Sequence, residues 1–234
     1  MNISLVVPTY QEEKGIEPFL RQFERQTLAR SEFEIIVVDG GSRDHTREIA
    51  ARLADRVIVQ TTPGIGGARN DGVALAQADL VATTDADCRV PPDWLERIVK
   101  DFQDPEIVAV CGPDGPFDGG LKARFYYFFL RAIIRAAALA GLYGTGGTNS
   151  AFRKKALLEI GGYRTLPHSD DIDVGVRIRA KGEILYDPQL YVGLSVRRLE
   201  KNGYLRTFFT WLRGDLKVLA GRPIEAVEYT RQEY

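Results

Sequence analysis

Cysteine is scarce in this sequence. The 234 residues contain two cysteines, Cys88 and Cys111, which lie far apart. They do not form the closely spaced pairs of a zinc site, and they are too few for a disulfide scaffold. No basic segment precedes a hydrophobic run at the start of the chain, so we predict no signal peptide. Both observations favour a reducing, cytoplasmic location.

An excess charge of either sign is also lacking. The 31 basic and 32 acidic side chains leave a formal net charge of −1. Such a chain has no overall field that attracts nucleic acid, so nucleic acid is not an expected partner. A site for an anionic ligand must therefore be built locally from a few residues.

Long uninterrupted hydrophobic runs are absent. The most apolar stretch, residues 125–143, contains Arg131 and Arg135 and follows Lys122 and Arg124. A charge at the centre of a bilayer costs roughly 2.5–3.5 kcal/mol on insertion scales. We therefore predict no transmembrane span here, but an amphipathic helix that lies on the core or on a membrane surface.

Hydrophobic residues nevertheless make up 44% of the chain, enough for one sizeable core. In the first half, short apolar runs alternate with segments of helical periodicity, which predicts a mostly parallel sheet with helices on both faces. The expected strands cover residues 3–7, 33–38, 56–60, 80–84 and 107–111, and the expected helices cover residues 15–25, 44–53, 68–76 and 92–102.

This alternation stops after residue 112. The later expected segments are a loop over 112–120, an aromatic and basic helix over 123–143, a helix over 154–160, and an amphipathic segment over 196–218. We predict an α/β catalytic domain over residues 1–195. Residues 196–234 are expected to form amphipathic helices that pack on this domain or on a membrane surface.

Polar residues follow the predicted strands, where α/β sheets bind their ligands. Asp85 and Asp87 come directly after a buried strand. Mg²⁺ and Mn²⁺ prefer oxygen ligands, and either ion neutralises a diphosphate leaving group. A solvated turn is the alternative for an isolated Asp-x-Asp, but its place after the strand favours a metal site. Asp39 is read as functional because Ser42 or Asp44 is available to cap the next helix.

A glycine-rich segment over residues 64–68 resembles part of a dinucleotide-binding fingerprint, with Asp85 roughly 20 residues further on. However, residues 61–63 separate this segment from the strand, and Asp85 is doubled by Asp87. A dehydrogenase is therefore not favoured. The glycines are expected to let the backbone approach a phosphate, with the charge of Arg69 nearby.

Five motifs then occur in one order: VPTYQEE at 7–13, VDGGSRD at 38–44, GARN at 67–70, DAD at 85–87 and GGY at 161–163. In this order they resemble the family-2 glycosyltransferases of the GT-A fold, over roughly residues 3–181. The resemblance implies transfer of a sugar from a nucleoside-diphosphate donor with inversion at the anomeric carbon. It also implies Mn²⁺ or Mg²⁺ as the cofactor.

The resemblance assigns donor-binding roles to individual positions. By this resemblance, the base and ribose pocket is lined by Pro8, Tyr10 and Glu12, and Asp39 contacts the base or the ribose. Arg69 lies beside the nucleotide. Asp85 faces the nucleotide, and Asp87 binds the metal. Cys88 is read as a packing residue.

An inverting transfer needs a base that takes the proton of the acceptor hydroxyl. The acidic pair Asp170-Asp171 resembles the family pair before a helix, which is often Glu-Asp. Asp171 aligns with the base, Asp170 is the alternative, and His168 is a rival. Capping of the helix by Ser169 or Asp170 is compatible with a base at Asp171.

Two further segments resemble family elements that border the sugar and the donor. In the loop over 144–149, Thr148 and Asn149 are expected to donate to sugar hydroxyls. Arg197, Arg198 and Trp211 are candidates for contact with the diphosphate or the acceptor; the alternative is a solvated face with a buried tryptophan. The Gln-x-x-Arg-Trp signature of processive members is missing, which argues against polymerisation.

We therefore expect a metal-dependent inverting hexosyltransferase. Its donor is a nucleotide sugar, with GDP-mannose first, and its acceptor a lipid-linked glycan or polyprenyl phosphate at the inner face of the membrane. One alternative is a UDP-glucose donor with a soluble or polysaccharide acceptor. The others are a nucleotidyltransferase and a nucleotide-sugar-binding module without turnover.

Overall fold

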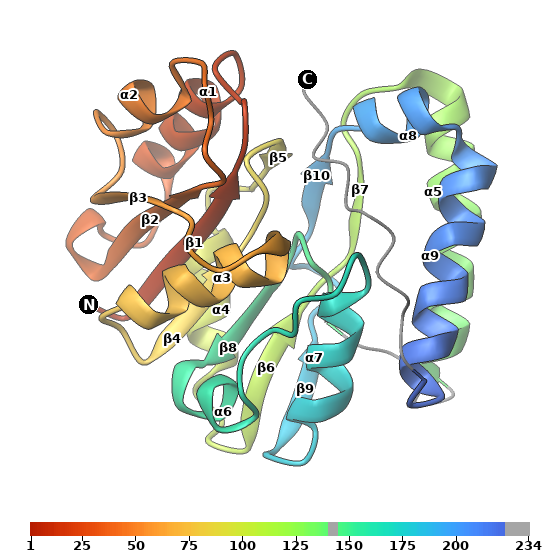
Figure 1. The fold of residues 1–234 in the computed structure, drawn as a ribbon. Helices are drawn as coiled ribbons and strands as arrows, with labels where there is room; N and C mark the ends of the chain where they lie inside the picture. Colours follow the sequence, from red (N-terminus) through yellow and green to blue (C-terminus); the bar gives the residue numbers. More distant parts are fainter. Residues whose placement is uncertain (140–144, 223–234) are drawn as a thin grey trace.

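A seven-stranded sheet forms the centre of the computed structural model, which describes residues 1–139 and 145–222 (Figure 1). Its strand order is β3-β2-β1-β4-β8-β6-β9. In that order the strands are Arg56–Val59, Phe33–Asp39, Ile3–Thr9, Leu80–Thr83, Ser150–Arg153, Ile107–Cys111 and Glu183–Tyr186.

The sheet is mostly parallel, as the sequence predicts. Strands β3, β2, β1 and β4 pair in parallel, and so do β6 and β9. Strand β8 runs antiparallel to both of its neighbours, β4 and β6. The pattern of residues 150–153 and 183–186 does not predict strands, because each is a short run in the less regular second half.

Helices cover both faces of the sheet. On one face lie α1 (Ile16–Leu20), α2 (Thr46–Ala50) and α4 (Trp94–Asp101), and on the other α3 (Gly64–Leu75), α6 (Lys154–Glu159) and α7 (Asp170–Ile178). Each face has its own cluster of buried side chains, with Trp94 of α4 fully buried in the first and Phe152 of β8 in the second.

Three predicted helices differ in their bounds. The helix over 15–25 is α1 followed by a 3₁₀ helix, Arg21–Arg25, and a second short 3₁₀ helix, Arg30–Glu32, precedes β2. Helix α2 is shorter than the predicted 44–53. Helix α3 begins at Gly64 rather than at 68, because its glycine-rich first turn packs closely on other backbone.

A second layer lies beside the main sheet. It contains a small sheet of β5 (Cys88–Arg89), β10 (Val192–Leu194) and β7 (Asp114–Pro116), and three helices, α5 (Gly120–Leu139), α8 (Arg197–Asn202) and α9 (Tyr204–Leu219). Figure 1 shows α5 and α9 side by side at the edge of the molecule. The predicted segment 196–218 is thus two helices, separated at Gly203 with a φ of 84°.

Helix α5 replaces the helix predicted over 123–143, of which residues 140–143 lie outside the described residues. Within the residues that the structure describes, no helix combines the length and the apolar character that crossing a bilayer requires.

Candidate active site

The segments predicted to carry chemistry meet at one edge of the main sheet. Thr9 at the end of β1 pairs with Asp39 at the end of β2, and Thr83 at the end of β4 pairs with Ser150. Because β8 is antiparallel, the loop before Ser150 arrives at the edge where β1, β2 and β4 end. The sheet therefore brings together residues 8–12, 39–44, 85–87 and 145–149.

Asp39 organises the loop that follows β2. Its side chain is fully buried and accepts hydrogen bonds from the backbone of Gly41 and Ser42, at 3.0 and 2.7 Å, and from Ser42 Oγ at 2.5 Å. Tyr10 lies against Gly40 of this loop. Asp44 accepts from the backbone N–H of Thr46, the first residue of α2, whose N-cap position is His45.

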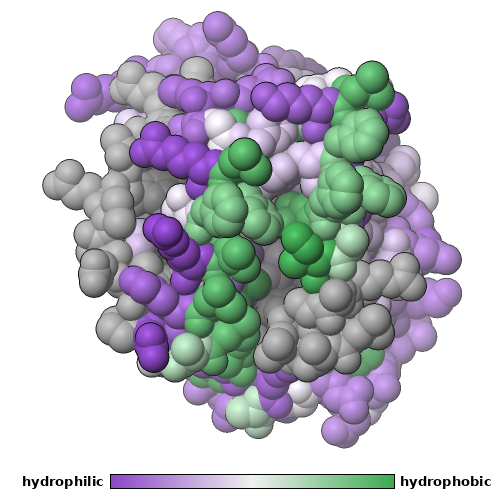
Figure 2. Space-filling view, turned by 90° about the vertical axis from the view of Figure 1, so that its right-hand side faces the viewer, coloured by the Kyte–Doolittle hydropathy of each residue, from purple (hydrophilic) through white to green (hydrophobic). Residues whose placement is uncertain are grey.

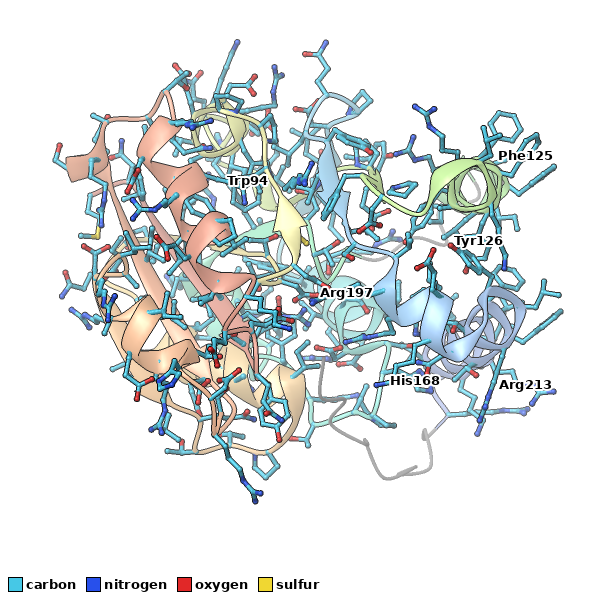
Figure 3. All side chains as sticks on the ribbon, turned by 90° about the horizontal axis from the view of Figure 1, so that it is seen from above. Trp94, Phe125, Tyr126, His168, Arg197 and Arg213 are labelled. Carbon is cyan, nitrogen blue, oxygen red and sulfur yellow. The ribbon has the colours of Figure 1, made fainter. Side chains whose placement is uncertain are left out.

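Glu12 and Asp87 both form ion pairs with the guanidinium of Arg197. Arg197 Nη2 lies 2.7 Å from Glu12 Oε1 and 3.3 Å from Asp87 Oδ2, and Figure 3 places Arg197 between the main sheet and the C-terminal helices. The backbone N–H of Ser195, just after β10, donates to the Asp87 carbonyl. Burial raises the pKa of Glu12, and Arg197 opposes this effect.

Asp85 pairs with a different arginine. Arg69 Nη2 lies 3.2 Å from Asp85 Oδ1, and the Arg69 side chain is almost completely buried. Burial raises the pKa of Asp85, Arg69 lowers it, and the charge of Asp87 raises it further. The exposed side chain of Arg198 also lowers the pKa of Asp85, which places its charge near this acidic pair.

The guanidinium of Arg69 also reaches the opposite side of the site. Its Nη1 donates to Asp170 Oδ2 at 2.7 Å, and its Nη2 donates to the Gly147 carbonyl at 2.9 Å. Burial alone would lower the pKa of Arg69, but Asp170 and Asp85 raise it above its ordinary value. Arg69 thus connects the acids after β4 to the acids of α7.

Two sequence motifs position this arginine. Asn70 donates to the Tyr163 carbonyl at 2.7 Å and accepts from the Tyr163 N–H at 2.8 Å, so the GARN and GGY motifs meet. A Cβ at Gly66 or Gly67 would lie 2.8 Å from Arg164 O or 2.3 Å from Thr62 O. The glycines at 66 and 67 therefore allow close packing of α3 on protein backbone, and their expected approach to a phosphate stays a prediction.

Asp170 and Asp171 are the first two residues of α7. Asp170 is buried against Arg69, whereas Asp171 Oδ2 accepts from the Gly147 N–H at 2.8 Å and remains partly exposed. Burial and the charge of Asp170 raise the pKa of Asp171 to about 7, although Arg69 opposes this shift. A carboxylate with this pKa accepts protons efficiently near neutral pH.

Thr148 and Asn149 occupy different surroundings. Asn149 is buried; its amide oxygen accepts from Trp94 Nε1 at 3.0 Å, and its amide nitrogen donates to the carbonyls of Leu190 and Pro113. Both amide hydrogens of Asn149 are thus used within the protein, which argues against the expected donation to sugar hydroxyls. Thr148 is partly exposed, and its hydroxyl lies 3.3 Å from an Asp114 carboxylate oxygen.

Trp211 lies on α9 and packs, half-buried, against the cluster between α5, α8 and α9. Pro8 is buried in β1, and Cys88 is buried as expected of a packing residue. Sequence reasoning missed Asp114, whose pKa is raised by burial. The surrounding Gly-Pro-Asp-Gly pattern indicates only a turn, so the sequence offered no signal for it.

Asp85 and Asp87 suit a hard divalent cation. Their side chains are 25% and 33% exposed, and both offer carboxylate oxygens. In the described part of the chain, no group of three or more histidine, cysteine or acidic side chains is arranged to hold a metal. Such a pair fits an ion that completes its coordination with phosphate oxygens and water.

Comparisons with known proteins agree with this architecture. Residues 4–161 match Glycosyl transferase family 2. The chain is 27% identical over 230 residues to the poly-beta-1,6-N-acetyl-D-glucosamine synthase of Staphylococcus aureus, covering 93% of this chain and 55% of the relative. It is 32% identical over 116 residues to the glycosyltransferase AglE of Haloferax volcanii, covering 47% of this chain and 38% of AglE.

Solved structures share the fold. The mannosyltransferase PcManGT from Pyrobaculum calidifontis, in complex with GDP-Man and Mn²⁺, aligns with a TM-score of 0.78 at 24% identity, over 95% of this chain and 65% of that one. The glucosyl-3-phosphoglycerate synthase from Mycobacterium tuberculosis, in complex with Mn²⁺, UDP and glucosyl-3-phosphoglycerate, aligns with a TM-score of 0.71 at 22% identity, over 97% and 82%.

The fold and these matches define a glycosyltransferase of the GT-A type. The chain belongs to Glycosyl transferase family 2. It spans 38% and 55% of the lengths of the two curated relatives named above.

Proposed function

We propose that this protein is a metal-dependent inverting hexosyltransferase that uses a nucleoside-diphosphate sugar. The observation that carries the proposal is the chain of contacts from Asp85 through Arg69 to Asp170, and through Gly147 to Asp171. It places a carboxylate with a pKa of about 7 across Arg69 from the acids that follow β4. A displacement reaction needs a base that deprotonates the acceptor on one side of the sugar and a site that binds the leaving group on the other side.

Asp171 acts as the base in this proposal. It removes the proton from the acceptor hydroxyl, whose oxygen then attacks the anomeric carbon of the sugar from the side opposite the diphosphate. Asp170 stays paired with Arg69 and fixes the start of α7. The partly exposed Asp171 carboxylate is the more accessible of the two, which supports its assignment over Asp170.

The nucleoside diphosphate leaves toward Asp85, Asp87 and the nearby arginines. A divalent cation, Mn²⁺ or Mg²⁺, held by Asp85 and Asp87 would neutralise the negative charge that develops on the diphosphate. Arg197 and Arg198 supply further positive charge on this side. Pro8, Tyr10, Glu12 and Asp39 lie at the neighbouring strand ends, where the base and ribose are proposed to bind, with Asp39 shaping the loop.

GDP-mannose is our first candidate donor, with UDP-glucose second. The two solved relatives contain GDP-Man and UDP, so the shared chemistry is a nucleoside diphosphate. We propose an acceptor that is a lipid-linked glycan or a polyprenyl phosphate, held at the cytoplasmic face of a membrane. The alternative is a soluble or polysaccharide acceptor.

Two apolar stripes on one face of the molecule support the membrane location. The outward sides of α5 and α9 carry exposed Phe128, Phe129, Leu205 and Phe209, each more than half exposed, and Figure 2 shows two hydrophobic stripes on this face. Exposed arginines, Arg124, Arg206 and Arg213, lie on the same two helices. Apolar side chains with flanking basic residues suit the surface of an anionic membrane. In this proposal residues 1–195 are the catalytic domain and residues 196–222 its C-terminal helical portion; residues 223–234 of the predicted portion lie outside the described residues.

Product analysis tests the reaction. The protein is incubated with Mn²⁺ and either GDP-mannose or UDP-glucose, with polyprenyl phosphate vesicles or water as acceptor. We expect release of the nucleoside diphosphate and loss of this activity in Asp87→Ala and Asp171→Asn. Leu158→Glu, at an exposed position of α6, is the control that should retain activity.

The two alternative functions, a nucleotidyltransferase and a binding module without turnover, predict different results. Release of pyrophosphate from a nucleoside triphosphate and a sugar 1-phosphate, supplied in place of the nucleotide sugar, would identify a nucleotidyltransferase. Metal-dependent binding of a donor without any release would identify a binding module. Full activity in Asp171→Asn would contradict the assigned base.

A further inference from the structure

Ser169, the residue directly before the acidic pair, has an unusual backbone. Its φ and ψ are 61° and 22°, in the left-handed region that residues other than glycine rarely adopt. Its carbonyl accepts a hydrogen bond from the Asp173 N–H at 3.1 Å, so its conformation sets the first turn of α7. Such a conformation persists only where the surroundings hold it.

Helix α9 supplies those surroundings. Asp215 lies near this loop: burial raises the pKa of its carboxyl, whereas the Ser169 hydroxyl and the charge of His168 lower it. His168 Nδ1 lies 3.0 Å from Ser169 Oγ, within hydrogen-bond distance. Figure 3 shows His168 beside α9.

Gly214 explains how α9 comes so close. It is buried, and an added Cβ would lie 2.0 Å from His168 Cε1 and 2.8 Å from Ser169 Oγ. Glycine is unfavourable in the interior of a helix, so its presence here fits the need for contact between α9 and the 168–169 backbone. Any other residue at 214 would push this loop away.

We infer that Gly214 and Asp215 of α9 are positioning residues for the base, because they hold Ser169 in the left-handed conformation that presents Asp171. This inference rests on the proposed function only for the role of Asp171. The contact itself makes the C-terminal helix part of the catalytic apparatus, although none of its residues need touch the reacting atoms.

The test compares Asp215→Ala, Asp215→Asn and the double variant Asp215→Ala/Ser169→Gly. In Asp215→Ala, we expect amide hydrogen exchange at residues 170–173 to rise about tenfold while the core strands stay protected. The kcat for nucleoside-diphosphate release, with GDP-mannose or UDP-glucose, Mn²⁺ and water as acceptor, should fall about tenfold with the donor KM unchanged.

The other two variants separate positioning from general stability. Asp215→Asn retains an acceptor oxygen for Ser169, so its kcat should fall less. The double variant should recover part of the lost kcat, because glycine adopts a positive φ without being held. Thr210→Ala, at an exposed position of α9, should match the wild type in both measurements.

Unchanged exchange at 170–173 in Asp215→Ala would overturn the inference. A fall in kcat that only follows a lower folded fraction, with no recovery in the double variant, would do the same. If the wild type releases no nucleoside diphosphate from either donor, the proposed function fails, and the exchange measurement still decides whether α9 holds Ser169.

Discussion

Arg69 is a single buried cation that serves acids on two sides of the site. Its guanidinium donates to Asp170, Asp85 and the Gly147 carbonyl, and its Nε is buried without a hydrogen-bond partner in the described part of the chain. A planar fork of donors suits such a bridge, whereas a lysine ammonium is a point charge on a flexible stem. Arg69 therefore fixes the positions of Asp85 and Asp170 relative to each other.

The pH dependence of the rate tests the base at the level of one residue. Asp171 accepts a proton only when ionised, so activity is lost as pH falls below its pKa of about 7. We expect kcat to rise about tenfold per pH unit below pH 7 and then to level off. Initial rates between pH 5 and pH 9, on the order of two units either side of the pKa, would show this rise in kcat with pH, the acidic limb of the pH–rate profile.

Two variants identify the side chain whose titration causes the acidic limb of the pH–rate profile. Asp171→Asn should remove it and lower kcat by about 10²–10⁴-fold. Burial lowers the pKa of His168, so a histidine base would place the limb below its ordinary pKa of 6.5. A limb at such low pH that disappears in His168→Gln would contradict Asp171 as the base.

At the scale of elements, α5 and α9 expose apolar side chains outward while they pack on each other inward. Phe125 is 65% exposed on α5, whereas Tyr126 points toward the C-terminal helices and meets the ring of Tyr204, with centroids 5.1 Å apart. Trp211 packs into the same cluster. The two helices therefore present their two apolar stripes on the same face of the molecule.

This surface predicts binding to anionic membranes. The wild type should sediment with phosphatidylserine vesicles at low salt, and Phe128→Glu/Phe209→Glu should weaken binding about tenfold or more, because each charge must enter the apolar boundary. Both side chains are exposed, so the fold should be retained. Leu158→Glu, on α6, is the matched control. Equal sedimentation of all three proteins would argue against this surface.

The elements of the first half were predictable because local patterns determine them. Strands β1, β2 and β4 are buried runs of apolar residues, so the strand-end positions of Asp39, Asp85 and Asp87 followed from the sequence. Asp44 likewise accepts a hydrogen bond from the N–H of Thr46, the first residue of the helix that follows it. Periodicity and turn chemistry carry this information within a few residues.

Other parts depend on contacts between distant segments. Strand β5 has only two residues and exists because it pairs with β10, about 100 residues later along the chain. The glycines at 64–67 have low intrinsic helix propensity, and packing against Thr62 and Arg164 overrides it. The role of Asp215 is likewise invisible without knowing that α9 packs on Ser169.

At the scale of the whole molecule, ligand binding should stabilise the fold. A nucleoside diphosphate with Mn²⁺ binds the folded site and not the unfolded chain, so it should raise the melting temperature by about 3 °C or more when present at about 100 times its Kd. A thermal-shift panel of GDP, UDP and their sugars, each with and without Mn²⁺, measures this effect.

The panel also ranks the donors. Asp87→Ala should lose the part of the shift that depends on Mn²⁺ and should melt like the wild type without ligand to within a few degrees. A shift by pyrophosphate or nucleoside triphosphates, with none by diphosphates or nucleotide sugars, would contradict the proposed donor class.

The ion pair between Glu12 and Arg197 joins residues that lie 185 positions apart. During synthesis, β1 and the following segment with Glu12 are made long before β10 and α8, whose first residue is Arg197. A nascent chain can therefore assemble much of its sheet without closing the site. Catalytic competence is consequently a late event of folding, and a chain released before residue 197 would bind and transfer poorly however well its first half is folded.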